Sequence, residues 1–149
     1  MEIERKFLIS EAPELGGLES ASIEQGYLAV ATEGGAEVRL RRRDTRLTLT
    51  AKGGGGLARD EAEIELDPER FERLWALTEG RRVHKRRYLI PAGELTIELD
   101  VYSGAHEGLI VAEVEFGDEA GAGRFEPPDW FGEEVTGRAE YRNASLATD

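Results

Sequence analysis

Residues 2–8, Glu2-Ile3-Glu4-Arg5-Lys6-Phe7-Leu8, alternate charged and apolar side chains with a period of two. Successive side chains of a β-strand point to opposite faces of its sheet. Glu2, Glu4 and Lys6 therefore share one face. Ile3 and Phe7 share the other. The period predicts a strand with one apolar face and one face that presents two carboxylates beside an ammonium group.

The same alternation recurs along most of the chain. Short stretches rich in glycine, proline and aspartate separate several of these segments, as turns between strands do. One helix is expected over residues 68–79, because Asp67 can cap it and Pro68 suits its first position. Short helices and turns are expected after residue 116. Strands are expected near residues 2–9, 22–31, 36–43, 46–52, 59–66, 82–91, 94–102 and 109–117.

The composition excludes several classes of protein. The 149 residues include 19 Lys and Arg against 31 Asp and Glu, a net charge of −12, which opposes binding to nucleic acid unless the positive charges are segregated. The absence of cysteine excludes disulfides, thiolate metal sites and a cysteine nucleophile. No apolar run approaches the ~20 residues of a membrane span. We therefore expect one cytoplasmic domain over residues 1–149, with neither a nucleic-acid nor a membrane partner.

Two architectures are compatible with the strand pattern. One is an ordinary antiparallel sheet with one solvated face. The other is a closed barrel whose charged face lines the lumen and whose apolar face packs outward under the helices. The charges within each strand are nearly uniform in sign, and a sheet of about eight strands tends to curl, which favours the barrel. Periodicity alone does not decide between the two.

The charged faces carry candidate ligands for a metal ion and for phosphates. Carboxylate oxygens are the ligands that Mg²⁺ and Mn²⁺ prefer, and these ions commonly bridge to phosphates. Arg binds phosphate oxygens bidentately, and Lys adds a compact charge. The bases could equally be salt-bridge partners of the acids. The candidate acids are Glu2, Glu4, Glu61, Glu63, Asp100, Glu113 and Glu115, and the candidate bases are Lys6, Arg39, Arg41, Lys52, Arg59, Lys85 and Arg87.

The order and spacing of these motifs resemble the CYTH superfamily, the triphosphate tunnel metalloenzymes. The resemblance begins with the Glu-x-Glu-x-Lys motif and continues through residues 25–28, 38–41, 48–52, 59–63, 85–88, 98–100, 112–115, 132–136 and 141–143. It implies an all-β-dominated (α+β) fold, an eight-stranded antiparallel closed barrel that forms a triphosphate tunnel, with a few flanking helices.

The resemblance also implies roles for the candidate residues. Glu2, Glu4 and Glu115 would hold a divalent cation, Mg²⁺ or Mn²⁺. Asp100 and Glu113 would assist with a second ion or position the attacking water. Glu61 and Glu63 match acidic positions of the family. The seven bases would bind the phosphates, and Tyr27 beside Lys6 resembles a catalytic Lys–Tyr pair.

The activity implied by the resemblance is metal-dependent hydrolysis of inorganic tripolyphosphate to pyrophosphate and phosphate, by a monomer or homodimer. Hydrolysis of a terminal phosphoryl group depends mainly on positioning and charge neutralisation, which this residue set can supply. The alternatives are a thiamine triphosphatase, a nucleoside triphosphatase, a class IV-type adenylate cyclase and a non-catalytic polyphosphate-binding module. The complete acidic set argues against the last, because binding alone would need mainly the bases.

Overall fold

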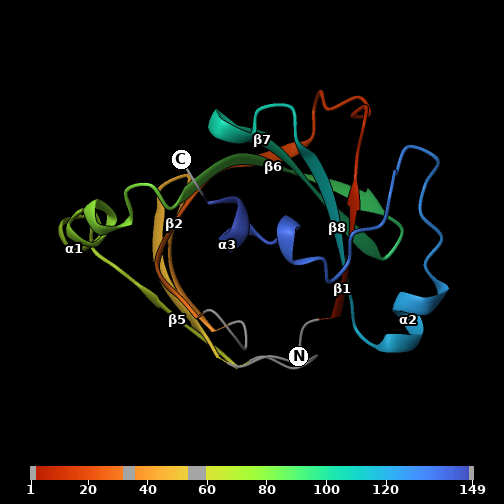
Figure 1. The fold of residues 1–149 in the computed structure, drawn as a ribbon. Helices are drawn as coiled ribbons and strands as arrows, with labels where there is room; N and C mark the ends of the chain where they lie inside the picture. Colours follow the sequence, from red (N-terminus) through yellow and green to blue (C-terminus); the bar gives the residue numbers. More distant parts are fainter. Residues whose placement is uncertain (1–2, 32–35, 54–59, 148–149) are drawn as a thin grey trace.

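A single curved antiparallel sheet dominates the computed structural model, which describes residues 3–31, 36–53 and 60–147 (Figure 1). Its strands are β1 (Ile3–Leu8), β2 (Glu19–Val30), β3 (Glu37–Arg43), β4 (Arg46–Lys52), β5 (Glu61–Glu65), β6 (Arg82–Ala92), β7 (Leu95–Ser103) and β8 (Ile110–Phe116). The helices are α1 (Pro68–Trp75), α2 (Glu119–Arg124) and α3 (Asn143–Leu146), with 3₁₀ turns η1 (Ala76–Thr78), η2 (Gly104–His106) and η3 (Ala139–Tyr141). No described helix is long and apolar enough to cross a membrane.

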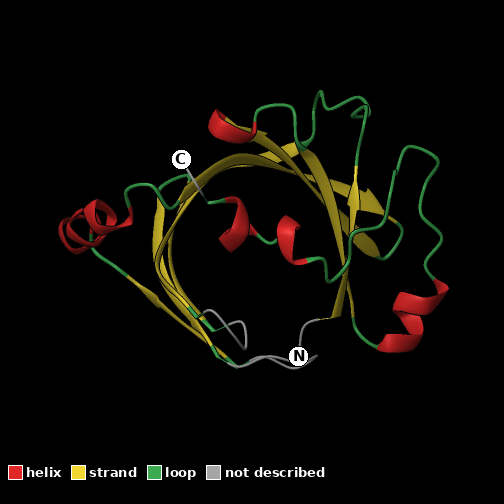
Figure 2. Ribbon diagram, viewed as in Figure 1, coloured by secondary structure: helices red, strands yellow, loops and turns green. Residues whose placement is uncertain are grey.

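The strand order is β1-β8-β7-β6-β2-β3-β4-β5, and every neighbouring pair is antiparallel. The expected eight-stranded, β-dominated architecture is therefore confirmed. One detail differs from the expectation: among the described residues no ladder joins β1 to β5, so hydrogen bonding does not close the barrel. Figure 2 shows β5 leaving the curve of the sheet and leading into α1 on the outside.

The expected boundaries agree closely with the structure. β2 begins three residues earlier than expected, because Glu19 already pairs with Leu89 of β6. The expected helix over 68–79 divides into α1 and η1. Asp67 caps α1 by accepting a hydrogen bond from the Arg70 amide at 2.8 Å. Gly80, with a φ of 81°, then turns the chain toward β6, a conformation that glycine adopts without strain.

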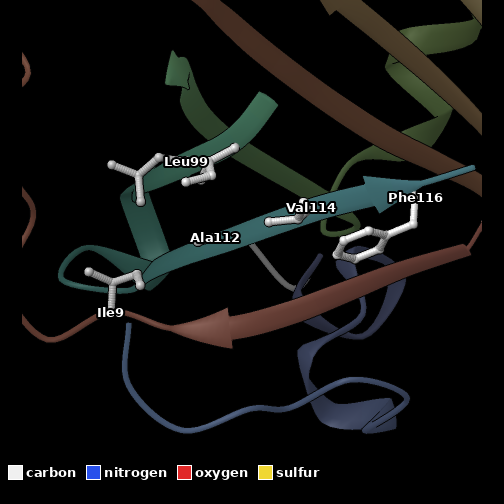
Figure 3. Packing of buried hydrophobic residues seen from close by; sticks show 6 residues of the cluster. Ile9, Leu99, Ala112, Val114 and Phe116 are labelled. Atoms are coloured by element: carbon white, nitrogen blue, oxygen red, sulfur yellow. The ribbon is translucent and has the colours of Figure 1, made fainter. Parts of the chain in front are cut away.

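The apolar faces of the strands pack outward, away from the charged faces. On β7 and β8, Leu99, Ala112 and Val114 are fully buried, and Phe116 extends the same cluster (Figure 3). Aromatic side chains of the segment after β8 cover this cluster: Phe125, Trp130 and Phe131. Burial of this face supplies a large part of the driving force for folding.

The α1 helix covers the outer face of β3 with a second apolar cluster. Leu40 of β3 packs against Phe71 and Trp75 of α1. Gly26 of β2 makes this packing possible, since a Cβ atom at that position would lie 2.5 Å from the Thr78 hydroxyl oxygen. A side chain at position 26 would push η1 away from the sheet.

The C-terminal segment lies on the opposite, concave side, where α3 and η3 are enclosed by the curve of the sheet (Figure 1). Leu146 and Ala147 are buried there against Tyr27 and Tyr102. The Tyr102 hydroxyl donates a 2.6 Å hydrogen bond to the Asn143 side chain, and His106 Nε2 lies 2.6 Å from the Leu146 carbonyl oxygen. These contacts place residues 142–144 beside the charged faces of the strands.

Candidate active site

A cavity of about 240 Å³ lies on the concave side of the sheet. The period of two places one set of side chains from each strand on this face. The C-terminal segment contributes the remainder. The lining residues are Glu4, Lys6, Tyr27, Glu37, Arg39, Arg41, Lys52, Glu61, Glu63, Arg87, Glu98, Glu113, Glu115, Arg142, Asn143 and Ala144.

Most of the side chains that the sequence singles out meet in this cavity. Lys85 and Asp100 are exceptions, because both are fully buried behind the lining residues. Glu2 and Arg59 lie outside the described residues. The predicted residues that line the cavity are Glu4, Lys6, Tyr27, Arg39, Arg41, Lys52, Glu61, Glu63, Arg87, Glu113 and Glu115.

One wall of the cavity, formed by β1 and β8, is acidic. Glu4 of β1 is directly opposite Glu115 of β8 in the strand register. Lys6 is opposite Glu113, and its Nζ lies 3.3 Å from Glu113 Oε1. Burial favours a raised pKa for Glu113, but the nearby charges of Lys6 and Lys85 outweigh it and lower that pKa. Glu113 is therefore ionised at neutral pH.

Lys85, Arg87 and Asp100 form a buried charged cluster beneath the cavity. Asp100 accepts hydrogen bonds from Arg87 Nε at 2.8 Å and Arg87 Nη2 at 2.9 Å, and its Oδ2 lies 2.8 Å from Lys85 Nζ. Burial alone would raise the pKa of Asp100, but these two cations lower it to about 2. Burial lowers the pKa of Lys85 to about 8, despite the attraction of Asp100. Arg87 extends from this cluster into the cavity lining.

The wall formed by β3 is basic. Arg39 Nε is buried and has no hydrogen-bond partner among the described residues. A buried donor without an acceptor is destabilising by ~1–3 kcal/mol, so an anionic oxygen in reach of Arg39 would be favourable. Burial, together with the charges of Arg39 and Arg87, lowers the pKa of Arg41 to about 10, which still leaves Arg41 protonated at neutral pH.

The wall formed by β4 and β5 carries one base, Lys52, and two acids, Glu61 and Glu63. Lys52 is opposite Glu61 in the register, with Nζ 3.7 Å from Oε2. The Thr50 hydroxyl donates a 2.9 Å hydrogen bond to Glu63. This wall therefore presents both a cation and carboxylate oxygens to a ligand.

Sequence reasoning missed several residues of the site. Glu37 and Glu98 share the parity of neighbouring predicted residues, so the strand period could have identified them. Arg142 and Asn143 carry no strand period, because they reach the cavity from the C-terminal segment; only the resemblance, through residues 141–143, includes them. The Arg142 guanidinium lies 3.7 Å from Glu37 Oε1 across the cavity. Gln25, buried beside Arg41, belongs to the motif at residues 25–28, but the sequence assigned it no role because it is uncharged.

The carboxylates suit a hard divalent cation, since such ions bind oxygen ligands. Within the described part of the chain, however, no three His, Asp or Glu side chains are gathered closely enough to form a complete metal centre. The acids line the cavity as dispersed single groups and opposed pairs. An ion held there would need further oxygen ligands.

Comparisons with known proteins agree with this geometry. The CYTH domain family matches residues 1–147. An inorganic triphosphatase of Nitrosomonas europaea is 49% identical over 148 residues, which are 98% of this chain and 96% of that protein. An inorganic triphosphatase of Acetivibrio thermocellus is 36% identical over 147 residues, 97% of this chain and 92% of that protein. The crystal structure of the inorganic triphosphatase NE1496 superimposes with a TM-score of 0.78 at 43% identity, covering 100% of this chain and 95% of that one.

Proposed function

The chain belongs to the CYTH domain family, and from this premise we propose that it is a divalent-metal-dependent hydrolase that converts inorganic tripolyphosphate to pyrophosphate and phosphate. Both bacterial relatives described above are named inorganic triphosphatases, which supports the substrate class. The cytoplasmic location and the monomeric or homodimeric state stay predictions from the sequence.

The observation that carries the proposal is the composition of the cavity lining. It combines bases from several strands with carboxylates, and among the described residues that line it Ala144 alone is apolar. A linear triphosphate needs cations along its length, and the metal ion that accompanies it needs oxygen ligands. We assign phosphate binding to Lys6, Arg39, Arg41, Lys52 and Arg87, with Arg59 from outside the described residues and Lys85 contributing its charge from beneath.

We assign the divalent cation, Mg²⁺ or Mn²⁺, to the acidic wall. Glu4 and Glu115 are like charges in directly opposite positions of an antiparallel pair, and a bound divalent cation would offset their mutual repulsion. Glu2, outside the described residues, is proposed as a further ligand. Glu61 and Glu63 offer further carboxylates on the wall formed by β4 and β5. Mg²⁺ commonly completes its shell with water and substrate phosphates, which fits a site without a complete protein cage.

In the proposed reaction water attacks the terminal phosphorus, the bridging P–O bond breaks and pyrophosphate leaves. A bound divalent cation supplies positive charge against the phosphate oxygens and thereby neutralises charge in the transition state. Arg39, Arg41 and Arg87 orient the phosphates and stabilise the charge that develops on them. We assign to Glu113, which is ionised and paired with Lys6, the role of accepting a hydrogen bond from the attacking water.

Asp100 is better suited to positioning than to metal binding. Both of its oxygens already accept from Arg87, and Lys85 lies against one of them. Its negative charge keeps two cations together beneath the cavity, where they would otherwise repel each other. We therefore propose that Asp100 holds Arg87 in the orientation that reaches the phosphates.

The test is a substrate panel of tripolyphosphate, pyrophosphate, ATP and thiamine triphosphate, each with Mg²⁺ or Mn²⁺, with all products quantified. Tripolyphosphate is expected to be hydrolysed well above the others, because the cavity offers cations for three phosphates and little apolar surface for a base or a thiazole. Preferred hydrolysis of ATP or thiamine triphosphate, or release of a cyclic nucleotide, would refute the assignment. Binding of tripolyphosphate without turnover would indicate a non-catalytic module.

A further inference from the structure

Gln25 is a fully buried polar side chain on β2 that lies beside the cavity without lining it. It precedes Tyr27 by two residues, so both side chains lie on the concave face of the sheet. In the register Gln25 is opposite Arg41, and Tyr27 is opposite Arg39. A buried amide is tolerated only when its hydrogen bonds are satisfied, and the partners of Gln25 are two residues of the cavity lining.

The contacts of Gln25 determine how its amide is oriented. Arg41 Nε and Nη2 lie 3.0 and 2.6 Å from Gln25 Oε1. A guanidinium group only donates hydrogen bonds, so the atom that faces it must be the amide oxygen. The amide nitrogen then faces Tyr27, where it donates a 3.1 Å hydrogen bond to the hydroxyl oxygen. This orientation follows from donor chemistry alone.

The orientation has a consequence for the Tyr27 hydroxyl. Its oxygen accepts from Gln25, so its single proton must point to a different partner. No acceptor for that proton is found among the described residues, and Tyr27 lines the cavity. Burial raises the pKa of Tyr27 to about 12, so the proton is present throughout the neutral range. Tyr27 is therefore a donor available to an oxygen of a bound ligand.

We propose that Gln25 is a positioning residue that directs the Tyr27 hydroxyl proton toward a phosphate oxygen of bound triphosphate and holds the Arg41 guanidinium beside it. The inference rests on the proposed function. Gln25 does not touch the ligand; it acts through two groups that do. Donors that are aligned before binding need no reorganisation when charge arrives, which is the physical basis of electrostatic preorganisation.

The test measures tripolyphosphate binding and turnover for Gln25→Met, which keeps the side-chain length and removes all three hydrogen bonds, two from Arg41 and one to Tyr27. Binding is measured by calorimetry in EDTA, where the absence of metal prevents turnover. The Kd is expected to rise about tenfold, as for the loss of one or two hydrogen bonds to charged or buried partners. A Kd within twofold of the wild-type value would overturn the inference, whether or not the protein proves to be a hydrolase.

A double-mutant cycle separates positioning from general stability. If Gln25 acts partly through Tyr27, the effects of Gln25→Met and Tyr27→Phe on binding will be coupled. The double variant will then lose less binding free energy than the sum of the losses in the two single variants. Strictly additive losses would overturn the role assigned toward Tyr27. Ile23→Val is the matched control, because Ile23 is fully buried on the same face of β2. It is expected to lower the melting temperature while leaving Kd and kcat unchanged.

Hydrolysis measured with Mg²⁺ keeps the two proposals distinguishable. An active wild-type enzyme with full activity in Gln25→Met would overturn the inference and leave the proposed function intact. A wild-type protein that binds tripolyphosphate without hydrolysing it would refute the proposed function, and the binding cycle would still decide the role of Gln25. If Gln25→Met does not fold, Gln25→Glu replaces it: its carboxylate keeps Arg41 but accepts the Tyr27 proton, so the coupling to Tyr27→Phe is still expected.

Discussion

Glu4 and Glu115 are directly opposite each other in the β1–β8 ladder, on the face that lines the cavity. Opposed like charges in an antiparallel pair are destabilising by a few tenths to about 1 kcal/mol. A cation bound between them would convert this repulsion into attraction. The pair therefore links the stability of the protein to divalent metal in a way that can be measured without substrate.

The first prediction concerns this pair. Mg²⁺ or Mn²⁺ alone is expected to raise the melting temperature of the wild-type protein, because a ligand at a hundredfold excess over Kd stabilises by ~2.7 kcal/mol. Each kcal/mol corresponds to roughly 2–4 °C for a domain of this size. In Glu115→Gln the shift should be largely lost, and kcat should fall with a higher metal requirement. The control is Glu94→Gln, an exposed acid of the β6–β7 turn. An undiminished shift in Glu115→Gln would contradict the metal assignment.

The second prediction distinguishes cavity bases from surface bases. Arg39→Met should chiefly raise KM for tripolyphosphate, because it removes a phosphate contact that is already made in the ground state. A hydrogen bond to a charged group is worth ~1.5–3 kcal/mol, so the increase should be roughly 10- to 100-fold. Arg86→Met is the matched control, since Arg86 is exposed and bonded to Ser20. The test is to measure KM for both variants by steady-state kinetics. Equal KM values would contradict the assignment of phosphate binding to the cavity.

The third prediction concerns pH. Burial lowers the pKa of Lys85 to about 8, so the cavity loses one positive charge as the pH rises above 8. The KM for tripolyphosphate should therefore rise on the alkaline side more steeply in the wild-type enzyme than in Lys85→Met, which has no charge to lose. Titration of the substrate itself is common to both proteins and cancels in the comparison. Parallel pH profiles would show that Lys85 does not support binding.

The fourth prediction concerns Asp100 and acid stability. Its pKa is lowered from 3.8 to about 2 in the folded state. The ionised carboxylate therefore contributes fully to the stability of the protein above pH 3.8, and this contribution is lost as the pH falls through 2. Asp100→Asn leaves Lys85 and Arg87 buried without their counter-charge, which should lower the free energy of unfolding by about 3–5 kcal/mol at neutral pH. Glu98→Gln, a partly exposed partner of Arg87, should have a much smaller effect. Denaturant titrations between pH 2 and pH 7 measure the free energy of unfolding of both variants. Equal losses of stability in Asp100→Asn and Glu98→Gln would contradict the role of the buried cluster.

The strand parity was predictable from the sequence because it depends only on the local backbone. Side chains two residues apart lie on one face of any strand, so Arg39 and Arg41 had to share a face, as did Glu113 and Glu115. The α1 start was predictable for the same reason, since Asp67 caps an amide only three residues away. The resemblance to the CYTH superfamily added the curvature and the orientation of the charged face, which periodicity left open.

Only the tertiary structure decided which charges face the cavity and which lie beneath it. Lys85 and Arg87 have the same parity on β6, yet Lys85 is fully buried against Asp100 while Arg87 reaches the lining. Arg142 joins the site because the C-terminal segment packs inside the curve of the sheet, and Gln25 matters because Arg41 lies opposite it on another strand. These relations join residues distant in sequence. They depend on the depth of each side chain in a curved sheet, a property of the packed molecule that the local pattern does not contain.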